Sequence, residues 1–131
     1  MGETALVESL VNDAMALVKQ LDDDGVSPSF VAWYYYDDAD EWRLLIASPN
    51  LDPLLQKQEP VAYRKVIDAL SKTAPTTMGV SYLKLVPTSS PLLAALRSLV
   101  RTDAKSIVRA HFTATTLNNI FMSQVIVLRA T

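Results

Sequence analysis

The stretch FVAWYYYDDADEWRLLIA, residues 30–47, decides the fold of this 131-residue chain. It begins with aromatic and β-branched residues, continues through the acidic segment 37–41 and ends in a second apolar run. Such runs favour strands, and a short polar segment between two of them is typical of a β-hairpin. With residues 37–41 as the loop, we expect Tyr36 to face Trp42 and Tyr34 to face Leu44 across the two strands.

Three helices are predicted around this hairpin. Apolar residues recur at helical spacing from Val7 to Leu21, which predicts the first helix. Proline is tolerated in the first turn of a helix, where no N–H donor is needed, so Pro60 and Pro91 indicate two further helix starts. The second helix is expected to end near Pro75.

Three more strands follow from runs of β-branched and aromatic residues. Residues 80–86 predict a third strand, and the segments 107–117 and 120–128 predict a closing hairpin. Asn118 and Asn119 lie between the last two runs, and asparagine accepts the left-handed conformation that a tight hairpin turn requires.

These elements give the order α-β-β-α-β-α-β-β in a single domain over residues 1–131, a length suited to one core. Hairpins at both ends indicate a five-stranded, mainly antiparallel sheet, so we expect a two-layer α+β fold. A first strand beside the last gives the order 2-1-5-4-3, which resembles profilin-like and GAF-like sheets. The runs AWYYYD (32–37) and EWRL (41–44) also resemble the opening hairpin of GAF domains. This resemblance covers about 20 residues and bears on topology alone.

The composition excludes several classes of protein. Half of the residues are apolar and 20% are charged, which excludes intrinsic disorder. The absence of cysteine excludes disulfide frameworks and thiolate metal sites, and His111 is the sole histidine. No glycine-rich phosphate loop or G-x-S-x-G nucleophile motif occurs. We therefore expect a protein that is not an enzyme and that needs no metal or cofactor.

The sequence also favours a cytoplasmic location. Its first residues lack a basic segment followed by an apolar block, so no secretory signal is recognised. Its apolar runs are far shorter than the roughly 20 residues that a membrane-spanning helix needs. We expect no membrane partner.

Charge is divided unevenly along the chain. Residues 1–52 carry a balance of −9 and residues 53–131 a balance of +7, which together give the formal −2. If the two halves interleave in one sheet, the charges pair within the fold, whereas separated halves would steer partners. We expect interleaving. The acidic run 22–24 closes the first predicted helix, where it opposes the helix dipole unless a basic group or solvent offsets it.

Apolar residues occupy both predicted faces of the first hairpin and of the last strand. A half-exposed antiparallel sheet should alternate apolar with polar residues, and three helices can cover one face. Unless the helices divide between the two faces, the other face is then an apolar patch for a second copy or another protein. We therefore expect a non-catalytic protein–protein interaction module or homodimerising module. The expected interaction residues are Trp33, Tyr35, Arg43, Tyr82, Lys84, Arg109 and Met122.

Two alternatives remain open. In single-stranded nucleic-acid binding, the aromatic rings would stack on bases while Arg43, Lys84 and Arg109 contact phosphates, although the pI of about 5.2 argues against a nucleic-acid partner. In small-molecule sensing, a pocket between sheet and helices would bind a ligand. Polar contacts in that pocket would come from Tyr63, Tyr82, Arg97 or His111.

Overall fold

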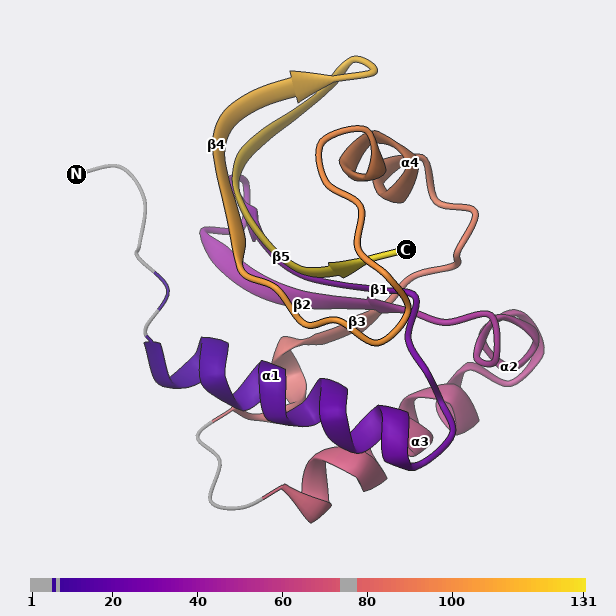
Figure 1. The fold of residues 1–131 in the computed structure, drawn as a ribbon. Coiled ribbons are helices and arrows are strands. Elements are labelled where there is room, and N and C mark those ends of the chain that lie inside the picture. Colours follow the sequence, from indigo (N-terminus) through magenta and orange to yellow (C-terminus); the bar gives the residue numbers. More distant parts are fainter. Residues whose placement is uncertain (1–5, 7, 74–77) are drawn as a thin grey trace.

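The computed structural model describes residues 6, 8–73 and 78–131. The predicted helix start at Val7 and the predicted helix end near Pro75 lie outside these residues. Figure 1 shows a curved sheet with helices on both sides. The helices are α1 (Glu8–Asp23), α2 (Asp52–Lys57), α3 (Glu59–Lys72) and α4 (Pro91–Arg97), with a 3-10 turn at Val80–Tyr82. The strands are β1 (Phe30–Tyr36), β2 (Glu41–Ala47), β3 (Leu83–Leu85), β4 (Ala110–Leu117) and β5 (Ile120–Ala130).

The α+β class, the order of the predicted elements and the five-stranded, mostly antiparallel sheet are confirmed, and α2 is an additional short helix that was not predicted. The strands lie in the order β3-β2-β1-β5-β4, with β1 in the centre beside β5 as expected. The predicted order 2-1-5-4-3 is wrong for β3, which pairs with β2 and not beyond β4. The reason is the connection through α2 and α3, which returns the chain so that β3 runs parallel to β2.

The register of the first hairpin differs from the prediction by one residue. Tyr35 lies opposite Trp42, and Tyr36 lies opposite Glu41. Glu41 belongs to the strand, and the turn closes at Asp40, which adopts a φ of 51°. A slip of one residue moves side chains to the other face of a sheet, so Trp33 and Tyr35 share a face with Trp42.

That aromatic face lies under α1 and α3. Trp33 is fully buried there, and its ring meets Tyr82 edge to face with a centroid separation of 5.5 Å. The rings of Tyr35 and Trp42 are 5.4 Å apart in the same core cluster. The apolar stripes of the two helices fill the rest of this cluster through Leu17, Val66 and their neighbours. Packing of this kind is a domain core, in which each buried ring removes its apolar surface from water.

The opposite face of the sheet is covered as well, because the helices divide between the two faces, and the apolar patch expected if they all lay on one face does not form. Leu93 and Leu96 of α4 pack against Phe30, Leu45 and Val127 in a second cluster. Figure 1 shows α4 inside the concave side of the sheet, with the β4–β5 hairpin curving around it. The physical reason is the division of the helices between the two faces, which leaves each face with its own apolar cover.

The curvature of the β4–β5 hairpin coincides with a break in its alternation. Ala114 adopts a φ of 46°, a left-handed conformation that is uncommon for alanine and that disrupts regular pleating. Across from it, Met122 and Val125 both belong to the α4 cluster although three positions separate them. The irregularity therefore turns the tip of the hairpin toward α4.

The acidic and basic halves of the chain interleave. Glu8 pairs with Arg109, Asp22 with Arg129, and Asp24 with Lys72. The guanidinium of Arg129 is fully buried and donates two hydrogen bonds to the Asp22 carboxylate, of 2.8 and 2.9 Å. Two of the three carboxylates of the acidic run 22–24, those of Asp22 and Asp24, are thus offset by cations of this chain.

Candidate functional site

The aromatic residues expected at an interface are internal. Trp33, Tyr35 and Met122 expose 0%, 4% and 1% of their surface, so these three are not available to a partner or to bases. Two causes combine: the register places Trp33 and Tyr35 beneath α1 and α3, and the bent hairpin carries Met122 onto the α4 cluster. Tyr82 is half-buried and packs on Trp33.

The three expected cations are each engaged within the chain. Arg43 donates from Nε to Glu41 at 2.9 Å and from Nη1 to the Ser81 carbonyl at 3.1 Å. Arg109 makes a bidentate ion pair with Glu8 next to the edge strand β4, which β1 and β5 separate from Arg43 on β2. The ammonium of Lys84 lies 4.9 Å from the centre of the Tyr36 ring. The structure therefore does not assemble them into one phosphate-binding surface.

A different place brings aromatic and charged groups together, where β1 and β5 diverge. The pairing between these strands ends at Tyr34 and Val125, while β5 continues to Ile120. A hollow of about 190 Å³ occupies the fork. We name its lining the acidic–aromatic rim: Tyr34, Tyr35, Tyr36, Asp37, Asp38 and Phe121.

Phe121 is the exposed aromatic of this rim. It exposes 57% of its surface, the largest fraction among the large hydrophobic side chains in the described ranges. It lies opposite Thr116 in the part of β5 that extends past β1. In the sequence, Phe121 is one apolar position among several of the last predicted strand. The signal that could have singled it out is length, because a strand of 11 residues beside one of 7 must project beyond the shared sheet.

Asp37 and Asp38 bring two negative charges to the rim, and the ammonium of Lys84 borders it at 4.9 Å from the Tyr36 ring. Across the residues that the structure covers, neither Asp37 nor Asp38 takes part in an ion pair. The ring centroids of Tyr34 and Tyr36 are 4.8 Å apart. Burial raises the pKa of the Tyr34 phenol, and the nearby Tyr36 and Asp37 raise it further because they disfavour another negative charge. The rim thus combines an exposed ring with two uncompensated carboxylates.

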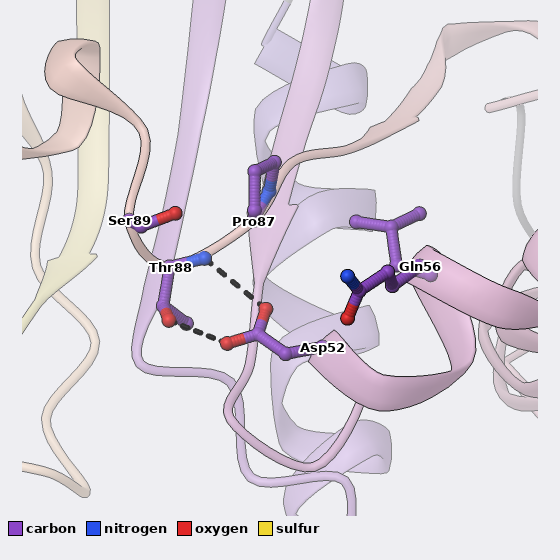
Figure 2. A pocket seen from close by; sticks show the side chains of 6 residues that line it. Asp52, Gln56, Pro87, Thr88 and Ser89 are labelled. Carbon is purple, nitrogen blue, oxygen red and sulfur yellow. Dashed lines mark hydrogen bonds between the residues drawn. The ribbon is translucent and has the colours of Figure 1, made fainter.

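A hollow larger than the rim's offers a weaker binding site. It measures about 450 Å³ and lies between α2 and the loop 87–89. Figure 2 shows that the Asp52 carboxylate is occupied, since it accepts hydrogen bonds from the backbone N–H and the hydroxyl of Thr88. Gln56 and Ser89 are the remaining polar side chains of the lining. An open groove whose one carboxylate is already paired has little left to orient a ligand.

The residues expected to line a sensor pocket lie apart. The Tyr63 hydroxyl accepts the backbone N–H of Leu85 at 3.0 Å, while His111 is exposed on β4 and Arg97 ends α4. A third hollow, of about 240 Å³, includes Asp24 and Lys72, which pair with each other at 3.1 Å. None of the three hollows is lined by Tyr63, Arg97 or His111, as far as the described residues show.

Comparison of the chain with protein-family models, with curated proteins and with solved structures gives no match. Within residues 6, 8–73 and 78–131, no group of three acidic, histidine or cysteine side chains is placed to hold a metal ion. Over the same residues, no helix has the length and apolar character that crossing a bilayer demands. The acidic–aromatic rim is therefore the candidate site with the clearest chemistry.

Proposed function

We propose that this protein is a non-catalytic interaction module that acts in the cytoplasm and docks a protein partner on the acidic–aromatic rim. The observation that carries the proposal is Phe121, a large ring with 57% exposure beside two carboxylates that have no cationic partner in the described chain. Aromatic side chains, phenylalanine among them, are enriched at the cores of protein–protein interfaces.

The chemistry of the rim selects the kind of partner. Asp37 and Asp38 attract a basic segment during encounter, and opposite charges accelerate association more than they strengthen the final complex. Phe121 supplies the apolar contact that slows dissociation. We infer that the partner presents lysine or arginine beside an apolar side chain.

The proposal is tested with two labelled peptides of equal length, one alternating arginine with leucine and one alternating glutamate with leucine. Fluorescence anisotropy is expected to show tighter binding of the basic peptide. Phe121→Ala should weaken that binding by roughly thirtyfold, because truncation of an interface hot spot costs about 2 kcal/mol. Asp37→Asn with Asp38→Asn should reduce its salt dependence.

The matched control is Val80→Ala. Val80 is 53% exposed but precedes β3 at the other edge of the sheet, so its truncation should leave peptide binding unchanged. Equal affinity for the two peptides, or equal effects of Phe121→Ala and Val80→Ala, would contradict the assignment of the rim.

A further inference from the structure

We propose that the outer edge of β4 pairs with β4 of a second copy of this chain, antiparallel and about a two-fold axis. This inference uses a surface other than the acidic–aromatic rim and stands independently of the proposed function. The homodimer expected from the sequence was placed on the aromatic sheet face, which the helices cover. The edge of β4 supplies a different and accessible surface.

β4 is an edge strand that lacks charged and proline residues, and its one irregularity is the left-handed Ala114. It lies at the end of the sheet and pairs with β5 alone among the described segments. Its eight residues, AHFTATTL, contain no proline, lysine, arginine, aspartate or glutamate. Natural edge strands are commonly guarded by such residues because unpaired N–H and C=O groups recruit another strand. An unguarded edge of this length is suited to strand addition.

The accessibility pattern of β4 indicates which strand is added. Its half-buried positions are 110, 112, 115 and 117, and its exposed positions are 111, 113, 114 and 116. This pattern reads the same in both directions, with its centre between Thr113 and Ala114. The left-handed φ of Ala114 creates the symmetry, because it shifts the alternation by one residue in mid-strand.

A strand whose accessibility pattern is palindromic can pair with a second copy of itself in the antiparallel direction so that positions of equal exposure lie opposite each other. Pairing centred between Thr113 and Ala114 places Phe112 opposite Thr115 of the second copy and His111 opposite Thr116, so each pair shares one face. Both strands then bend at the same place, which keeps the pairing continuous past the irregularity. A two-fold interface requires this kind of self-complementarity, which an unrelated strand would match only by chance.

Charge favours the same arrangement. Arg109, which precedes β4, comes opposite the uncharged Asn118 of the second copy in this register, and Glu8 already neutralises Arg109. A parallel, in-register pairing would instead bring Arg109 opposite Arg109 of the second copy. Like charges directly opposite each other destabilise strand pairs.

The experiment is sedimentation of the full chain from micromolar to near-millimolar concentration. A strand-edge contact is small, so we expect a weak dimer whose mass approaches twice 14.4 kDa as concentration rises. Thr113→Lys places two ammonium groups close together beside the two-fold axis and should weaken dimerisation at least tenfold. Thr113→Glu should do the same with two carboxylates. An equimolar mixture of the two variants should restore a dimer, because the charges then attract.

Circular dichroism and thermal melting establish that both variants remain folded. A chain that stays monomeric throughout, a dimer unaffected by Thr113→Lys, or a mixture that fails to reassociate would each overturn the proposal. Binding of a foreign strand to β4 by a monomeric chain would overturn it too. Because Phe121→Ala should leave the dimer intact, failure here is distinguishable from failure of the rim.

Discussion

Arg129 shows how one side chain connects four parts of the chain. Its guanidinium is fully buried and donates to Asp22, to the carbonyl of Pro28 at 3.1 Å and, from Nε, to the carbonyl of Ser106 at 2.9 Å. It therefore joins the end of α1, the segment before β1 and the loop before β4 to β5. Buried charge is tolerated only when it is paired and hydrogen-bonded in this way.

We expect Arg129→Met to lower the free energy of unfolding by about 3 kcal/mol, because it leaves buried acceptors without a donor. Urea denaturation measures this change. The control is Arg43→Met, which removes an ion pair whose partners are 35% and 47% exposed together with an exposed hydrogen bond to the Ser81 carbonyl, and it should cost less than Arg129→Met, about 1 kcal/mol. Equal losses of unfolding free energy in the two variants would show that the buried ion pair of Arg129 stabilises the fold no more than the exposed pair of Arg43.

The elements were largely predictable, whereas their junctions were not. Helical spacing identified α1 and α3, and strand-forming residues identified both hairpins, since each pattern reflects a local periodicity. The one-residue slip at Glu41 was missed because the positive φ of Asp40, not composition, sets where the loop ends. α2 was also missed, and β3 was placed at the wrong edge. Both depend on the path of the connection through space.

The candidate site was less predictable than the fold. Trp33 and Tyr35 were chosen for their aromatic character, but burial depends on which helices cover which face, a property that periodicity does not encode. Phe121 carries no sequence signal of its own. Its exposure arises from the excess length of β5 over β1.

The β4–β5 turn was predicted from Asn118 and Asn119, and their φ values of 51° and 66° suit a type I′ turn. Glycine is preferred at the second of these positions, so Asn119→Gly should stabilise the protein by about 0.5 kcal/mol. Asn119→Val should destabilise it by about 1–2 kcal/mol, because a β-branched residue resists positive φ. Thermal denaturation of both variants tests the turn, and the opposite ranking would exclude this geometry.

At the scale of the whole molecule, ion pairs link the acidic and basic halves and make stability depend on pH. A hydrogen bond from Arg109 holds the pKa of Glu8 below its usual value, and bonds from Lys72 and then Gln20 do so for Asp24. Lowered carboxylate pKa values mean that the unfolded chain binds protons first on acidification. These pairs therefore stabilise the fold above the ordinary carboxylate pKa range.

We expect the urea midpoint to fall as the pH drops below about 4.5, the ordinary Glu pKa, and to continue falling through the lower folded-state values. Glu8→Gln should flatten part of this decline, because it removes one group whose pKa differs between the folded and unfolded chain. A midpoint that rises on acidification, or a variant with the parent's full pH dependence, would contradict this role of the ion pairs.

The central position of β1 has a consequence for folding during synthesis. β1 pairs with β2 almost as soon as both leave the ribosome, but its other neighbour, β5, is translated only after all four helices. Until then one edge of the most aromatic strand has no native partner, and Asp22 lacks the ion pair with Arg129. Nascent chains halted before β5 should therefore depend on chaperones, with the acidic residues beside the first hairpin helping to keep them from aggregating.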